Sequence, residues 1–190
     1  MFEQMLLTVA LGASLALPAP AVEFHIRDTI GTFHTPAEWK DAKAILLLFI
    51  TTDCPVGNSY VPEMNRIAEQ YAARGVLTFA VFPNADVSFS AAVNYARDYQ
   101  FRFPVLLDSD QDLVRLAGAS VTPQAAILAQ DGELMYRGRI DNRVENFGLQ
   151  RQNATEHDVC DALDAILAGR HPRVQFTRSV GCAITLRNKN

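Results

Sequence analysis

Residues 44–57 read AILLLFITTDCPVG, an apolar run that ends in an aspartate, a cysteine and a proline. The unbroken apolar segment Ala44–Phe49 predicts a central strand that is covered on both faces. Residues 57–74 carry apolar side chains at helical spacing, so a helix is expected to follow the strand. Cys54 would then lie at a helix N-terminus, where free N–H groups and partial positive charge favour the reactive thiolate. Any chemistry of this chain is expected to centre on Cys54.

Strands and helices are predicted to alternate along the rest of the chain. The expected elements are a strand at 76–82, a helix at 88–100, a strand at 103–107, a short helix at 112–117, and a hairpin of 125–129 with 134–140. A last helix is expected to be capped by Thr155 and ended by Gly169. Parallel strands followed by an antiparallel hairpin require an α/β fold, in which a mixed central sheet carries helices on both faces.

The overall composition excludes several classes of function. The 190 residues have a formal net charge of −4, and lysine and arginine are not clustered, which argues against nucleic-acid binding. Hydrophobic residues make up 49% and charged residues 20%, as in globular proteins, so disorder is not expected. A glycine-rich phosphate loop and zinc-type cysteine pairs are both missing, and we predict no cofactor or metal site.

The beginning of the chain is typical of an exported protein. Residues 1–21 read as a signal peptide, because the apolar run Met5–Leu17 is too short for a membrane span and small alanines follow it. The run is not preceded by Lys or Arg, so an uncleaved anchor and a buried N-terminal helix stay open as alternatives. We expect a secreted or periplasmic protein with one domain at 22–172, a packed tail at 173–190, and no stable membrane span after cleavage.

The order of these features resembles the thioredoxin superfamily, and more closely its redoxin branch of alkyl hydroperoxide reductase/thiol-specific antioxidant type. The resemblance covers roughly residues 23–142. It implies a three-layer thioredoxin-like fold in which Cys54 is the reactive cysteine, Pro62 lies in the following helix, and Pro123 belongs to a loop facing the sulfur. If the Thr122–Pro123 bond is cis, the Thr122 backbone would lie beside Cys54 and could bind a partner chain.

The chain departs from the dithiol thioredoxins at one position. Gly57 stands where they carry a second cysteine, so a mixed disulfide at Cys54 has no neighbouring thiol to resolve it. The preceding Asp53 also opposes thiolate formation if it is ionised nearby. Our first hypothesis gives the resolving role to Cys182, next to Gly181 in the tail, within a thiol–disulfide oxidoreductase that acts on a thiol or disulfide protein partner. A static Cys54–Cys182 disulfide and a buried tail thiol are the alternatives.

A second hypothesis is peroxide chemistry. Thr51 precedes Cys54 by three residues, as in the peroxiredoxin pattern Pro-x-x-x-Thr-x-x-Cys, but Leu47 replaces the proline. Arg137 and Arg139 are the candidates for polarising a peroxide, and hydrogen bonding at the strand end is the simpler role for Thr51. Under either hypothesis the substrate-binding residues are expected to be Thr51, Pro55, Thr122 and Pro123.

A third hypothesis is a non-enzymatic redoxin scaffold that binds a partner or Cu(I). Two thiolates, from Cys54 and Cys182, would suit this soft metal. None of the four histidines stands at a recognisable ligand spacing. Cys160, on the predicted last helix, is expected to be a half-buried structural thiol.

Overall fold

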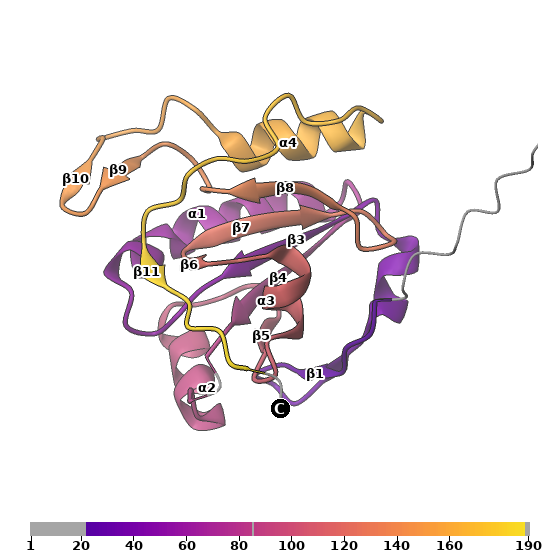
Figure 1. The fold of residues 1–190 in the computed structure, drawn as a ribbon, viewed down its shortest axis with the longest axis vertical. Helices are drawn as coiled ribbons and strands as arrows, with labels where there is room; N and C mark the ends of the chain where they lie inside the picture. The colour runs from indigo at the N-terminus through magenta and orange to yellow at the C-terminus, as the bar shows by residue number, and fades with distance from the viewer. Residues whose placement is uncertain (1–21, 85, 189–190) are drawn as a thin grey trace, which may run out of the picture.

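A five-stranded sheet forms the centre of the computed structural model, which describes residues 22–84 and 86–188 (Figure 1). The predicted signal peptide lies outside the described residues. The strand order is β5-β4-β3-β7-β8, with bounds β3 Ala44–Phe49, β4 Val76–Phe82, β5 Val105–Leu107, β7 Gln124–Leu128 and β8 Leu134–Gly138. β3, β4 and β5 are parallel, whereas β7 is antiparallel to β3 and β8. The predicted mixed sheet is therefore confirmed.

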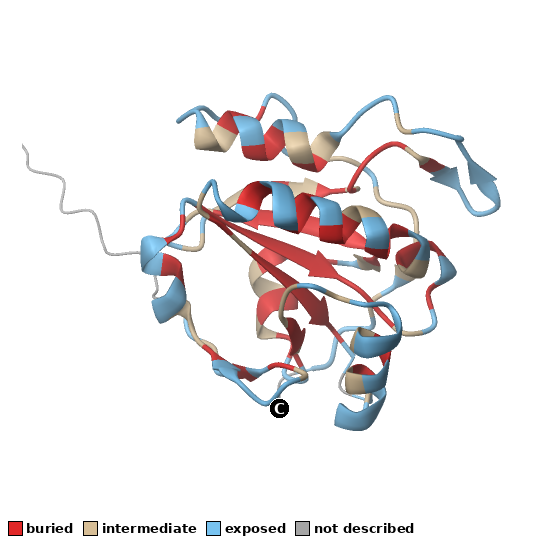
Figure 2. Ribbon diagram, turned by 180° about the vertical axis from the view of Figure 1, so that it is seen from behind, coloured by how far each residue is buried: buried red, intermediate tan, exposed pale blue. Residues whose placement is uncertain are grey.

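Helices cover both faces of this sheet, as the sequence predicted. They are the 3-10 helix η1 Pro36–Asp41 and the α-helices α1 Pro55–Ala72, α2 Phe89–Asp98, α3 Asp112–Ala117 and α4 Asp158–Leu167. Leu46 and Leu48 of β3 pack in one apolar cluster with α1, α2 and α4, whereas Leu47 packs in a second cluster with η1 and α3. Figure 2 shows the buried strands between these layers. Alternate side chains of one strand thus connect the two halves of the core.

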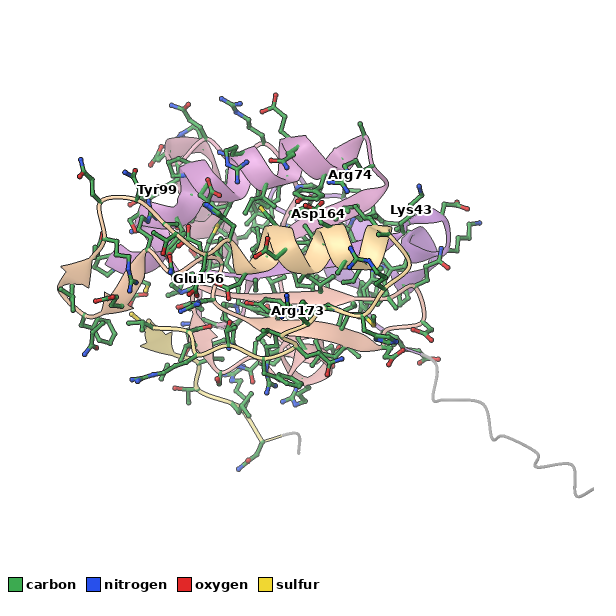
Figure 3. The ribbon with its side chains drawn as sticks, turned by 90° about the horizontal axis from the view of Figure 1, so that it is seen from above. Lys43, Arg74, Tyr99, Glu156, Asp164 and Arg173 are labelled. Atoms are coloured by element: carbon green, nitrogen blue, oxygen red, sulfur yellow. The ribbon has the colours of Figure 1, made fainter. Side chains whose placement is uncertain are left out.

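The contact between α1 and α4 includes a polar bridge near the end of α1. Arg74 Nη1 lies 2.6 Å from Asp164 Oδ1, and the two side chains point toward one another in Figure 3. The Tyr71 hydroxyl donates to the same carboxylate at 3.1 Å.

Among the described residues, no helix has the length and apolar character needed to cross a membrane.

The start of α4 differs from the prediction. The helix begins at Asp158 with His157 at its N-cap, not at a cap formed by Thr155. The reason is that Thr155 Oγ1 accepts a hydrogen bond from the Asn142 side-chain amide at 2.8 Å, while Asn142 Oδ1 accepts from Thr155 N and Glu156 N. These hydrogen bonds with Asn142 hold Thr155 and Glu156 in the loop, so they do not form the first turn of α4.

Three short antiparallel ribbons complete the fold. They pair β1 Ile26–Arg27 with β2 Phe33–His34, β9 Val144–Asn146 with β10 Leu149–Gln150, and β6 Val121–Thr122 with β11 Cys182–Ala183. The last of these attaches the chain's tail to the segment that leads into β7. In Figure 1 the tail descends from α4 past β6 toward the opposite edge of the sheet.

Candidate active site around Cys54

Cys54 is held at the N-terminus of α1 by its own sulfur. It is the N-cap residue, and Sγ accepts a hydrogen bond from Gly57 N at 3.5 Å. The thiol donates to the Thr122 carbonyl oxygen at 3.0 Å. None of the Cys54 surface is exposed. The sulfur therefore sits between the free N–H groups of the helix and the segment before β7.

That segment contains the only cis peptide bond of the described residues, between Thr122 and Pro123. Thr122 is buried, and its hydroxyl has no hydrogen-bond partner within the described chain. A Cβ built on Gly57 would lie 3.8 Å from both Pro123 Cδ and Cys54 Sγ, so helix, proline and sulfur are in close contact. Pro55, the first residue of α1, is exposed beside this site.

Cys182 is the second thiol at this site. β11 pairs with β6 so that Cys182 is directly opposite Thr122, the residue whose carbonyl accepts from Cys54. All three cysteines are free thiols in this structure. A hydrogen bond with Cys54, partial burial, and the charges of Cys54 and Asp53 raise the pKa of the Cys182 thiol to about 11. The structure thus brings together two sulfurs that lie far apart in the sequence.

Gly181 makes this approach of the tail possible. A Cβ on Gly181 would overlap the Thr122 carbonyl oxygen and lie 2.6 Å from its carbonyl carbon. Every other amino acid carries that atom, so the tail can reach this position only with glycine at 181.

The predicted peroxide-binding groups are not directed at Cys54. The Thr51 hydroxyl donates to Asp53 Oδ1 at 2.8 Å. Arg137 Nη1 donates to the Gly118 carbonyl at 2.6 Å, and Arg139 Nε donates to Asp158 at 2.8 Å. Both candidate arginines thus make hydrogen bonds to partners other than Cys54.

In the described part of the chain, no group of three or more His, Cys, Asp or Glu side chains is arranged to hold a metal ion. Cys160 lies on α4, half-buried, with Arg66 Nη2 3.7 Å from its sulfur. Burial raises the pKa of the Cys160 thiol. This cysteine is thus in a separate region from the Cys54 site, as expected for a structural thiol.

Polar residues that follow β8 support α1 from the β9 side. The Tyr60 hydroxyl donates to Asp141 Oδ1 at 2.5 Å, and the Arg143 guanidinium lies 4.2 Å from the centre of the Tyr60 ring. Arg143 Nη2 also donates to the Ser59 carbonyl at 3.0 Å. The polar run at 141–143 was the available signal, but its partners on α1 are about 80 residues away in sequence, 81 for the Tyr60–Asp141 pair.

A family model described as Redoxin matches residues 16–155, well over half of the chain. This chain belongs to the Redoxin family. The position of Cys54 at the start of α1, opposite a cis-proline, agrees with the resemblance drawn from the sequence.

Two solved structures resemble this redoxin over different shares of the chain. A hypothetical protein from Sinorhizobium meliloti has a TM-score of 0.77 and 27% identity, covering 93% of this chain and 98% of that one. A putative thiol:disulfide interchange protein DsbE from Chlorobium tepidum has a TM-score of 0.53 and 20% identity, covering 62% and 80%. The second match bears on the fold alone. Together they confirm the predicted thioredoxin-like α/β fold.

A curated relative is the thiol-disulfide oxidoreductase ResA of Bacillus thuringiensis subsp. konkukian. It is 28% identical to this redoxin over 100 residues, which are 52% of this chain and 57% of ResA. The match thus spans little more than half of the relative's length.

Proposed function

We propose that this redoxin is a thiol–disulfide oxidoreductase in which Cys54 is the nucleophile and Cys182 the resolving thiol. The observation that carries the proposal is the placement of Cys182 directly opposite Thr122, the residue whose carbonyl accepts the Cys54 hydrogen bond. A resolving thiol must attack the Cys54 sulfur directly, and the proposal gives this role to Cys182 in the tail because Gly57 provides no sulfur. The name of the ResA relative supports the same class of reaction.

The reaction proceeds in two exchanges. The Cys54 thiolate attacks one sulfur of a partner's disulfide, so that a mixed disulfide forms and the other partner sulfur leaves as a thiolate, which takes up a proton. The Cys182 thiolate then attacks the Cys54 sulfur, and the second partner sulfur leaves in the same way. The partner gains two electrons and two protons, and the redoxin becomes the Cys54–Cys182 disulfide. An external dithiol returns it to the reduced form by the reverse sequence.

The protonation of Cys182 fits its place in this order of steps. While Cys54 is free, hydrogen bonding to its sulfur keeps the Cys182 pKa at about 11, so Cys182 stays a thiol. Once Cys54 is bound in a mixed disulfide, that hydrogen bond is gone and Cys182 loses its proton more easily. The resolving thiol is thus activated only after the first exchange.

The proposed partner is a protein with an accessible thiol or disulfide, and the proposed location is secreted or periplasmic. The apolar run Met5–Leu17 supports export, and an oxidising compartment would let a Cys54–Cys182 disulfide persist. The N-terminal sequence of the protein recovered from an exporting bacterial host tests the location. A mature chain that starts after Ala21 is expected; a retained Met1 in the cytoplasmic fraction would contradict it.

Trapping of the mixed disulfide tests the reaction. With a disulfide-bonded peptide as substrate, Cys182→Ser should accumulate a peptide adduct on Cys54, whereas the unaltered protein should release both peptide thiols. Cys160→Ser is the control and should behave like the unaltered protein. An adduct that persists equally with and without Cys182 would contradict the resolving role. Oxidation of Cys54 to a sulfenic acid by hydrogen peroxide that is faster than formation of its mixed disulfide with the peptide would favour a peroxidase instead.

A further inference from the structure

The backbone edge next to the Cys54 site is already occupied by the chain's own tail. Cys182 and Ala183 pair antiparallel with Thr122 and Val121, and Ile184 N donates to the Ser120 carbonyl at 2.8 Å. An exposed strand edge is where an extended peptide adds to a protein by main-chain hydrogen bonds. In this structure a polypeptide partner would have to compete with residues 182–184 for the edge that lies beside Cys54.

The tail also helps to bury the nucleophile. Cys54 has no exposed surface, although thiol–disulfide exchange requires its sulfur to contact a sulfur of the partner. Cys182 packs against the apolar cluster that contains Cys54, and Gly181 lies against the Thr122 carbonyl that accepts the Cys54 hydrogen bond. Some part of this cover must therefore move before Cys54 can react with another molecule.

The tail is the part of the cover with the least buried surface. None of the residues 173–188 is fully buried, while Val56, Gly57, Thr122 and Pro123 on the other sides of Cys54 all are. Detaching a segment that buries little apolar surface is the least unfavourable way to open the site.

Thr177 marks the boundary between two parts of the tail, because its hydrogen bonds attach the preceding part to the end of the sheet. Thr177 Oγ1 is 2.7 Å from the Tyr136 hydroxyl and accepts from Arg139 N at 3.0 Å, and Thr177 N donates to the Arg137 carbonyl at 3.1 Å. These bonds fasten the chain to β8. Beyond this point the tail crosses to β6, and its end is held by Gln111, which donates to the Thr185 carbonyl and accepts from Arg187 N, both at 2.8 Å.

We propose that residues 178–188 form an autoinhibitory strap, which occupies the Val121–Thr122 edge in place of an extended cysteine-containing polypeptide and must detach before Cys54 reacts. This inference rests on the proposed function for the identity of the partner. The burial of Cys54 by the strap does not depend on that function. Because only the open form reacts, the rate of any reaction at Cys54 is proportional to the fraction of molecules whose strap is detached.

Alkylation of Cys54 by iodoacetamide in the reduced, full-length protein tests the strap. Gly181→Ala introduces the Cβ that overlaps the Thr122 carbonyl, so it should detach the strap and raise the Cys54 alkylation rate by about tenfold or more. The matched control is Thr185→Ala, an exposed strap residue whose carbonyl bond to Gln111 is kept, and its rate should stay within about twofold of the unaltered protein. An unchanged Cys54 rate in Gly181→Ala would overturn the strap.

A second measurement uses the unaltered protein, so it does not depend on how Gly181→Ala folds. If one opening exposes both groups, the Ile184 amide and the Cys54 thiol should give the same opening constant, within about threefold, by hydrogen exchange and by alkylation. Constants that differ by about a hundredfold would overturn the strap. Neither measurement involves a partner disulfide. A protein that passes both and still forms no peptide adduct would contradict the proposed function and leave the strap standing.

Discussion

At the scale of single residues, the two thiols at positions 54 and 182 share an environment that controls their protonation. The hydrogen bond with Cys54 is the largest cause that raises the pKa of Cys182 to about 11, from an ordinary value of 9.0. Removing the Cys54 sulfur should therefore make Cys182 more acidic. A lower pKa increases the thiolate fraction more than it decreases the intrinsic nucleophilicity of the thiolate.

We predict that Cys182 in Cys54→Ala is alkylated up to about tenfold faster than in the unaltered protein at about pH 8. The rate is measured by mass spectrometry of the peptide that contains residue 182. Cys160→Ser, which alters a distant thiol on α4, should leave the rate unchanged. An equal rate in Cys54→Ala and the unaltered protein would show that the two thiols do not interact.

Gly57 allows the reverse experiment, in which the missing neighbouring thiol is restored. A Cβ at this position would lie 3.5 Å from Cys54 Cβ, within the range found in disulfides, and would meet no closer atom. We predict that Gly57→Cys combined with Cys182→Ser forms an internal disulfide with Cys54 and releases both thiols of the peptide substrate. Quantification of free peptide thiol checks this result. Persistence of the mixed disulfide, as in Cys182→Ser alone, would contradict it.

The position of the reactive Cys54 could be predicted from the sequence, whereas the hydrogen-bond partners of the surrounding side chains could not. The location of Cys54 followed from the strand and helix patterns on either side of it, which are local. The hydrogen bond from Thr51 to Asp53, and the bonds that direct Arg137 and Arg139 away from Cys54, depend on which acceptors the folded chain places nearby. No pattern in the sequence specifies those choices.

At the scale of elements, the long strands were predictable, whereas β6, β9, β10 and β11 were not. β3 is six buried residues long, so its pattern is visible in the sequence. β6 and β11 contain two residues each and form only because the tail returns to the loop before β7. β9 and β10 were not expected either, although they form a projecting hairpin (Figure 1). Pairing of such short segments depends on long-range contacts and leaves no periodicity.

The β1–β2 ribbon contains a buried histidine that makes its stability depend on pH. His34 Nε2 is 3.1 Å from Asp28 Oδ2, and Nδ1 is 2.9 Å from Glu38 Oε2. Burial lowers the pKa of His34, but the hydrogen bonds and charges of Glu38 and Asp28 outweigh it, and the pKa is raised above 6.5. A raised folded-state pKa stabilises the protein fully below the unfolded value and loses that effect as the pH rises through the folded value.

We predict that the free energy of unfolding of the unaltered protein falls as the pH rises above the ordinary histidine value of 6.5, and that His34→Gln reduces this fall. Urea denaturation across that range measures both. His157→Gln, which alters the exposed N-cap histidine of α4, is the control and should retain the slope. The same slope in His34→Gln and the unaltered protein would contradict the assignment.

At the scale of the whole molecule, the three-layer arrangement could be predicted and the path of the tail could not. Apolar strands and amphipathic helices in this order allow few arrangements of the sheet. Val180, Cys182 and Ile184 of the tail pack against the two core clusters, but its path is set by backbone and polar contacts such as those of Gln111 and Thr177, which leave no pattern in the sequence. The pairing of Cys182 with Thr122 is therefore seen only in the structure.

A disulfide between residues 54 and 182 would close a loop through most of the domain. In the chain-entropy description, a loop of this length adds about 5 kcal/mol to the free energy of unfolding. We predict that the oxidised protein withstands clearly more guanidinium chloride than the reduced protein, and that Cys182→Ser removes the difference while Cys160→Ser keeps it. Equal midpoints for the oxidised and reduced protein would contradict the pairing.

The most direct test of the Cys54–Cys182 dithiol is the disulfide map of the full-length protein after mild oxidation, determined by mass spectrometry without reduction. We predict one cross-linked peptide pair that joins Cys54 to Cys182, with Cys160 free. This cross-linked pair should disappear on addition of a dithiol. A free Cys182 beside a Cys54 that is oxidised to the sulfenic or sulfinic acid, or bonded to Cys160, would contradict it.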